Sequence, residues 1–319
     1  MKLRRGWSSN GLHWADLGER GDVVGMQLLL TVDRLFGRWA VTAFLYPVVV
    51  YFLLTASHAR RGSRDFLRAV RARAIALGRR AGDGVNSFNH VLQFGHAVLD
   101  KGAIWGGTFS GSDVEFDDPS MFRQMRARGS IFIGSHLGNL EVLRAFGEMQ
   151  GLKVNALVFT RNSPKFNRWL SNVNAKALDG MIEIDSLGPD AVIRLQDRVR
   201  MGEHVAIVGD RLSVRHKERS IHAPFLGKSA PFPEGPFILA SLLDCPVYLI
   251  FCLRVGRKYR VYLEPFADPL VLPRAERRPA LEQAIRRYAE RLEAYCLMAP
   301  TQWFNFFDFW EQADARRSE

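Results

Sequence analysis

From residue 129 onward, short apolar runs alternate with stretches of helical periodicity. The apolar runs cover residues 131–134, 153–159, 181–184, 205–208, 247–253 and 259–263, and the helical patterns cover residues 140–149, 164–178, 189–201, 235–243 and 279–297. Such alternation is typical of crossover units, in which a helix connects two parallel strands. We therefore expect an α/β fold with a mostly parallel sheet flanked by helices, and a site beyond the carboxyl ends of its strands.

A histidine falls in the turn after the first of these runs. The strand-like residues 131–133 end at small residues, and His136 precedes a helix for which Asn139 is a suitable N-cap. Glu141 falls in the first helical turn, where the helix dipole favours a carboxylate, so it could orient the imidazole as a general base. The spacing alone is weak in a chain with 8 histidines and 33 acidic residues. A helix-capping glutamate beside an unrelated histidine is the alternative.

Charged residues also follow two later strands of the expected sheet. Arg161 follows the run at 153–159, and Asp210 and Arg211 follow the run at 205–208. We expect them to line the same cleft as His136, because carboxyl ends of parallel strands meet at one edge. The alternative is ordinary solvated loop charge. A dense basic loop continues from Arg211 through Arg215, Lys217 and Arg219, and such a loop at a cleft could hold phosphate.

Residues 223–240 are rich in aromatic rings, glycines and prolines. We expect a stiff loop that includes Gly227 and leads into a helix at Gly235, with backbone N–H groups able to face an anion or an oxyanion. An ordinary helix-entry loop is the alternative.

An uncharged stretch at residues 39–57 precedes the expected α/β region. A helical span needs about 20 apolar residues, so this stretch is just long enough, and membrane helices tolerate a proline such as Pro47. Arginines are more frequent after it than before it, which places the following residues in the cytoplasm by the positive-inside rule. The alternative is one long helix over residues 23–57 that lies on the membrane or packs on the domain.

Composition and charge limit the remaining choices. We divide the chain into an anchor segment at 1–58, a basic helical region at 59–119 and an α/β domain at 120–319. The net charge of +11 favours an anionic partner, and the 3 cysteines suggest neither a disulfide framework nor a zinc site. A non-catalytic basic protein that binds membranes or nucleic acid is the second interpretation. Aromatic residues are not interleaved with the basic loop as in single-strand binders, which argues against nucleic acid.

The order of these motifs resembles a known family. GSHLGNLE at 134–141, then Arg161, then GDR at 209–211 and APFLGKSAPFPEGPFILA at 223–240 are similar to the late lipid A acyltransferases, within the lysophospholipid acyltransferase superfamily. The resemblance extends to the anchor, through Trp14, residues 19–21 and residues 51–52.

The resemblance implies an enzyme on the cytoplasmic face of a bacterial inner membrane. It would move a fatty acyl chain from an acyl carrier protein or coenzyme A thioester to a hydroxyl of a lipid or glycolipid acceptor, with no metal, cofactor or nucleic-acid partner. His136 and Glu141 would be catalytic, and Arg161, Asp210, Arg211, Gly227 and Gly235 would bind substrate.

The chain departs from the family's pattern near its carboxyl end. Family members have Trp followed by His and basic residues there, whereas this chain has Trp303 followed by aromatic residues, Asn305 and Asp308. This departure suggests a less anionic acceptor, unless the aromatic end simply packs on the membrane interface.

Overall fold

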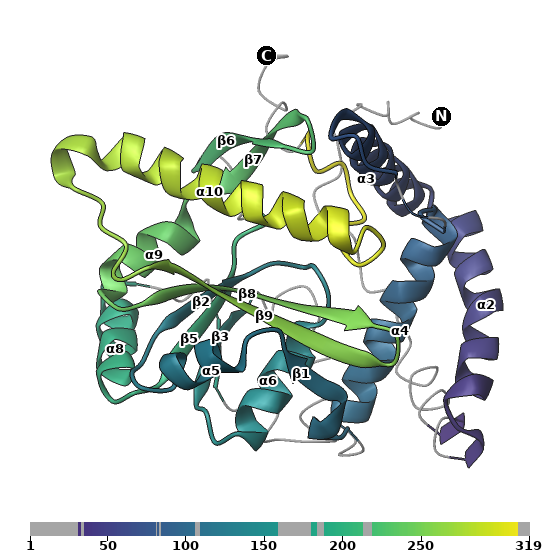
Figure 1. The fold of residues 1–319 in the computed structure, drawn as a ribbon, viewed down its shortest axis with the longest axis horizontal. Coiled ribbons are helices and arrows are strands. Elements are labelled where there is room, and N and C mark those ends of the chain that lie inside the picture. Colours follow the sequence, from purple (N-terminus) through teal and green to yellow (C-terminus); the bar gives the residue numbers. More distant parts are fainter. Residues whose placement is uncertain are drawn as a thin grey trace, which may run out of the picture.

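A computed structural model of the chain describes residues 31–32, 35–80, 82, 84–105, 109–158, 180–183, 188–212 and 219–311. Its centre is a 7-stranded sheet in the order β1-β9-β8-β2-β5-β3-β4 (Figure 1). All neighbouring strands pair in parallel except β8 and β9, which form an antiparallel pair. The expected mostly parallel sheet flanked by helices is confirmed.

The strands of this sheet are β1 (Val114–Phe116), β2 (Ile131–Gly134), β3 (Val154–Val158), β4 (Met181–Glu183), β5 (His204–Val208), β8 (Val247–Val255) and β9 (Lys258–Ala267). The helices are α2 (Arg38–Thr55), α3 (Ser57–Ala76), α4 (Ser87–Trp105), α5 (Pro119–Met125), α6 (Leu140–Met149), α8 (Pro189–Arg200), α9 (Gly235–Leu243) and α10 (Arg277–Met298).

The sheet is covered on both faces, and the residues of β2 pack alternately on one face and the other. Successive side chains of a strand point to opposite faces. Ile131 and Ile133 belong to the large core cluster that includes residues of α3, α8, α9 and α10, whereas Phe132 packs with Met125 of α5 and Leu263 of β9. Every residue of β2 is buried. A central strand buried on both faces explains why the sequence here is uninterruptedly apolar.

Two parts of the fold differ from the expectation. The region expected to be a stiff loop contains an antiparallel hairpin of β6 (Ser220–Phe225) and β7 (Lys228–Pro233), which lies beside α10 (Figure 1). The region at 59–119, expected to be helical, contains the strand β1, which extends the sheet next to β9. Neither strand region was expected from the sequence. The prolines of β7 argued against a strand, although prolines fit a two-stranded edge, and β1 has only three residues.

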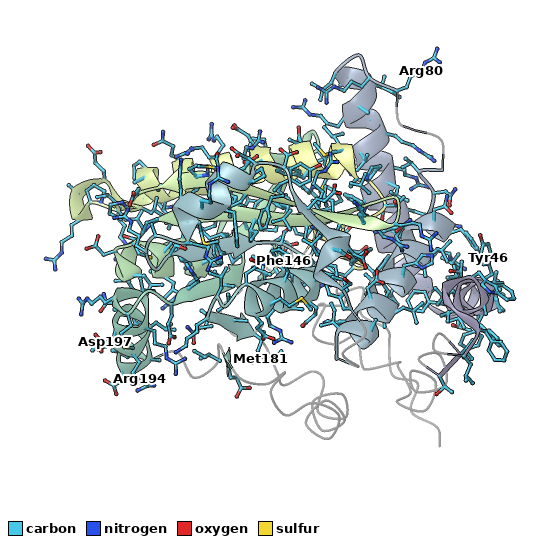
Figure 2. The ribbon with its side chains drawn as sticks, turned by 60° about the horizontal axis from the view of Figure 1, so that its bottom comes forward. Tyr46, Arg80, Phe146, Met181, Arg194 and Asp197 are labelled. Atoms are coloured by element: carbon cyan, nitrogen blue, oxygen red, sulfur yellow. The ribbon has the colours of Figure 1, made fainter. Side chains whose placement is uncertain are left out.

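The amino-terminal helices flank one end of the sheet. α2 packs one stripe on α4, where Val41 and Leu45 are buried with Leu99. Its other face is exposed and apolar, and Tyr46 lies at the edge of this face, with its ring centroid 5.6 Å from that of Phe88 in α4 (Figure 2). No single described helix meets the length and hydropathy needed to cross a bilayer, whereas α2 and α3 meet it as a pair bent by 97°.

Candidate active site

Strand register brings His136 and Asp210 together. β2 and β5 are adjacent and parallel, with Gly134 opposite Val208, so the residues two positions beyond each strand meet at the same edge of the sheet. The Nδ1 atom of His136 lies 2.8 Å from Oδ1 of Asp210. The backbone N–H of His136 donates to Oδ2 of the same carboxylate at 2.9 Å. Asp210 therefore fixes both the ring and the backbone of the histidine turn.

The Asp210 carboxylate is buried and receives two further hydrogen bonds. Trp303 Nε1 donates to Oδ2 at 2.9 Å, and Asn305 Nδ2 donates to the same oxygen at 3.0 Å. Burial alone would raise the pKa of Asp210, but the neighbouring His136 and Arg211 and the hydrogen bonds from His136 hold that pKa below its usual value. Asp210 is therefore an anion at neutral pH.

The partners of His136 determine its proton position. A carboxylate only accepts hydrogen bonds, so Nδ1 carries the proton and Nε2 keeps its lone pair. Burial and the Arg211 charge lower the pKa of His136, and this outweighs the opposing effect of Asp210, so the ring is neutral at neutral pH. The side chain is 26% exposed, whereas Asp210 is 0% exposed. This neutral imidazole, accessible on one side, has the protonation state of a general base.

The carboxyl-terminal segment completes the site. Trp303, Asn305, Phe307 and Phe309 are buried, while the residues between them are half-buried, as expected for an extended segment with one face on the core. The Arg211 guanidinium donates to Asn305 Oδ1 at 2.7 Å, so Asn305 joins Arg211 to Asp210.

The aromatic end thus packs inside the domain rather than on a membrane interface. We did not assign Trp303 and Asn305 to the site from the sequence. The sequence feature that could have indicated this assignment is the polar Asn305, which occupies a buried position in a segment where aromatic residues alternate.

His90 of α4 supports this segment from behind. Its Nε2 lies 2.8 Å from the Trp303 carbonyl oxygen, which can only accept, so Nε2 carries the proton. Its Nδ1 lies 3.0 Å from the hydroxyl oxygen of Ser63. Burial lowers the pKa of His90 to about 4, so the ring is neutral. A continuous set of hydrogen bonds therefore joins Ser63, His90 and the Trp303 residue to Asp210.

The chain matches the family model for bacterial lipid A biosynthesis acyltransferases over residues 112–312, which is more than half of its length. It belongs to this family. No individual curated protein matches the chain. Membership makes it an acyltransferase and decides against the non-catalytic interpretation. The matched region contains the whole His136, Asp210, Trp303 and Asn305 cluster.

The carboxylate expected to orient His136 has other partners in this acyltransferase. Asn139 caps α6 as expected, with its side chain accepting from the Glu141 N–H. The Glu141 carboxylate, however, lies 3.4 Å from Lys101 Nζ and 3.1 Å from Arg144 Nε. Burial would raise the pKa of Glu141, but these two cations hold it below its usual value. The expectation that Glu141 holds the ring is corrected, because Asp210 makes that contact.

The histidine turn is locked against β8 and the carboxyl-terminal segment. The N–H groups of Gly138 and Asn139 donate to the carbonyl oxygens of Gln302 and Cys252 at 2.8 and 2.9 Å. Gly138 has φ of 78°, and a Cβ there would lie 1.9 Å from the Cys252 carbonyl oxygen. Only glycine fits this position. The backbone that carries His136 is therefore held on both sides.

Two other expected site residues that the structure describes, Gly227 and Gly235, lie outside the hydrogen-bonded cluster. Gly227 lies in the turn of the β6–β7 hairpin, and Gly235 begins α9 beside Glu234, which pairs with Arg278 near the start of α10. The cluster lies at the other end of α10 from Gly235, and α10 is about 30 Å long. The turn with Gly227 is nearer to the cluster, because the neighbouring Leu226 N–H donates to Glu293 and the Phe225 ring centroid lies 5.3 Å from that of Trp303. The assignment of Gly227 and Gly235 to substrate binding stays a prediction. Arg161, Arg215 and Lys217 lie outside the described residues, and the role of Arg161 in binding the acceptor stays a prediction.

Among the described residues, no three His, Cys, Asp or Glu side chains come together as metal ligands.

Proposed function

We propose that this enzyme transfers a fatty acyl chain from an acyl carrier protein or coenzyme A thioester to a hydroxyl of a lipid A-like glycolipid or another lipid acceptor. The observation that carries the proposal is the His136–Asp210 pair, with Nδ1 bound by a buried carboxylate and the ring partly exposed. Family membership supports acyl transfer as the reaction class.

The chemistry follows from the protonation states. His136 Nε2 takes the proton of the acceptor hydroxyl as that oxygen attacks the thioester carbonyl carbon, and Asp210 stabilises the resulting imidazolium. The tetrahedral intermediate collapses with cleavage of the carbon–sulfur bond. The imidazolium returns its proton to the departing thiolate, so the products are an acyl ester and a free thiol.

Charged residues around the pair suit anionic substrates. Burial lowers the pKa of Arg211 to about 10, so this side chain is a cation at neutral pH beside the histidine turn. Glu141 holds Lys101 on the other side, and the Lys101 charge also contributes to the lowered pKa of His136. We assign Glu141 the role of a positioning residue for this cation. A positive surround favours an acidic carrier protein, coenzyme A or a phosphorylated acceptor.

We further propose that α2 holds the enzyme on the cytoplasmic face of the bacterial inner membrane. Its exposed face carries Trp39, Phe44, Tyr46, Tyr51 and Leu54, and no charged residue occurs from Trp39 to Thr55. Basic residues begin in α3 directly after the break at Ala56. An apolar face followed by a basic helix supports insertion with the catalytic domain on the cytoplasmic side.

The test is thioester-dependent acyl transfer by the full-length enzyme in detergent. We expect His136→Ala to lower kcat by about 10²- to 10⁴-fold, the usual contribution of a general base, without changing the thermal midpoint by more than a few degrees. His222→Ala, at an exposed histidine of β6, is the matched control and should retain full activity. A His136→Ala enzyme as active as His222→Ala would reject the assignment. Comparing lipids from cells with and without the gene would identify the acceptor.

A further inference from the structure

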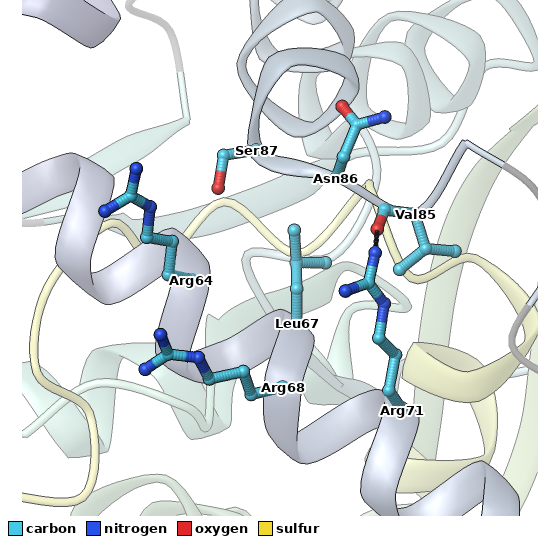
Figure 3. A pocket seen from close by; sticks show the side chains of 7 residues that line it. All are labelled: Arg64, Leu67, Arg68, Arg71, Val85, Asn86 and Ser87. Atoms are coloured by element: carbon cyan, nitrogen blue, oxygen red, sulfur yellow. Dashed lines mark hydrogen bonds between the residues drawn. The ribbon is translucent and has the colours of Figure 1, made fainter.

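A pocket of about 250 Å³ opens between α3 and the start of α4, apart from the His136 cluster (Figure 3). Leu67 and Val85 form its apolar lining, and Arg64, Arg68 and Arg71 carry its charge. Typical small-molecule pockets enclose about 300–1,000 Å³. This one is smaller and has room for a compact group, with the positive charge supplied by its arginines.

The three arginines form one face of α3. Spacings of four and three residues place Arg64, Arg68 and Arg71 side by side on a helix, and all three are exposed. Arg71 donates to the Val85 carbonyl oxygen across the pocket, which fixes its guanidinium at the rim (Figure 3). Arg68 pairs at 3.2 Å with Asp65, in a contact where both side chains are highly exposed and the attraction is weak. Arg64 forms no ion pair with any residue that the structure describes.

The pocket wall opposite the arginines is formed by residues 85–87 and is held in place by hydrogen bonds. Asn86 Oδ1 accepts the Asn89 N–H at 2.9 Å, which caps the start of α4. The Ser87 hydroxyl lies 3.0 Å from that of Ser63, which in turn contacts buried His90. The wall facing the arginines is therefore tied to the same hydrogen bonds that support the active site, and it needs little rearrangement to receive a ligand.

We propose that this pocket binds the phosphate headgroup of an anionic membrane lipid. Guanidinium groups match phosphate oxygens in pairs, and three of them on one helix face supply the charge. The pocket also lies close to the proposed membrane contact, because α3 starts after a single residue beyond α2 and turns by 97°. Juxtamembrane basic residues are attracted to anionic leaflets. This placement rests on the proposed insertion of α2.

The proposal is tested by titrating dihexanoyl phosphatidylglycerol into the full-length enzyme in a non-ionic detergent, with calorimetric detection. Dihexanoyl phosphatidylcholine serves as the zwitterionic comparison and reports partitioning into micelles. The variant is Arg64→Gln with Arg68→Gln, since both side chains are exposed and can be neutralised without disturbing the fold. The matched control is Arg194→Gln with Arg286→Gln, at exposed arginines of α8 and α10. Arg194 lies far from α3, at the opposite end of the molecule from Tyr46 (Figure 2).

We expect phosphatidylglycerol to bind at least tenfold more tightly than phosphatidylcholine. The Arg64/Arg68 variant should lose at least tenfold in affinity, and the Arg194/Arg286 variant should stay within twofold of the parent. Equal losses in the two variants would overturn the proposal in favour of general charge attraction, and equal binding of the two lipids would overturn it as well. His136→Ala should bind phosphatidylglycerol like the parent, so this result is independent of whether His136 is catalytic.

Discussion

The environments of two carboxylates, at the end of β5 and at the start of α6, determine what each can do. Asp210 is 0% exposed and accepts from the His136 backbone, the His136 ring, Trp303 and Asn305. Glu141 retains 15% exposure and is balanced by the cations Lys101 and Arg144. Both are anions, but the Asp210 carboxylate binds the imidazole of His136, whereas the Glu141 carboxylate pairs with other side chains. Proximity in the chain is therefore a poorer guide to function than register across the sheet.

The largest effect that separates these carboxylates should come from Asp210→Asn. This change keeps the shape but removes the charge that selects the Nδ1–H tautomer and stabilises the imidazolium. We expect kcat to fall by about 10²- to 10⁴-fold, since loss of the orienting carboxylate in comparable acid–base sites has effects of that size.

The pH profile of the residual Asp210→Asn activity provides a second measurement. Asp210 raises the pKa of His136 against burial and Arg211, so its removal should move the acid limb of the kcat/KM profile to lower pH. In the parent, the His136 pKa lies below its usual value, so activity should be close to its plateau at pH 7 and decline only in acid. An acid limb that moves to higher pH in the variant would contradict the pairing.

A smaller loss of kcat is expected from Asn305→Leu, which tests the hydrogen bonds that the carboxyl-terminal segment makes with Asp210. The substitution removes a donor to Asp210 and the acceptor of the Arg211 Nε–H, and leaves the buried Asp210 and the half-buried Arg211 with fewer partners. A buried polar group left unsatisfied costs about 1–3 kcal/mol, equivalent to roughly 5- to 150-fold if it falls on the transition state. Steady-state kinetics measure the loss. Phe304→Leu, at the neighbouring half-buried position, is the control and should stay within a few fold of the parent.

Much of this architecture was predictable from periodicity. The expected runs at 131–134 and 205–208 correspond to β2 and β5, and the pattern at 140–149 corresponds to α6. The placement of His136 and Asp210 at one edge also followed from parallel pairing. The direct hydrogen bond between them could not be predicted. It requires that the two strands end at the same register and that each side chain lies two residues beyond its strand. Trp303 and Asn305 were harder still, since their contacts with Asp210 span more than 90 residues.

The pH dependence of folding tests the support behind the site. Burial lowers the pKa of His90 to about 4, below the value of 6.5 expected in an unfolded chain. The unfolded chain therefore binds a proton first as pH falls, and stability is lost from pH 6.5 down to pH 4. Linkage predicts a loss of about 2 kcal/mol from His90 between pH 7 and pH 5. Denaturant titrations in detergent measure it.

His204 provides an independent contribution of the same sign, because burial lowers its pKa to about 4 as well. His90→Phe should therefore reduce the pH 7 to pH 5 difference in the free energy of unfolding by about 2 kcal/mol while the His204 contribution persists. The variant will be less stable at pH 7, since the Trp303 carbonyl oxygen loses its donor. An unchanged pH difference would contradict the neutral, buried state of His90.

The smallest effect on catalysis should come from Glu141→Gln. The amide keeps the N-terminal position in α6 but no longer neutralises Lys101 and Arg144, and their uncompensated charge should lower the pKa of His136 further. Activity at pH 7 should fall by less than tenfold, while the free energy of unfolding drops by about 1–3 kcal/mol because the buried Arg144 side chain loses one of its carboxylate partners. The ratio of the two kcat values, Glu141→Gln over Asp210→Asn, is the decisive quantity. A ratio near one would mean that Glu141 acts on the reacting groups in a substrate-bound arrangement, whereas a ratio of ten or more places the orienting charge on Asp210.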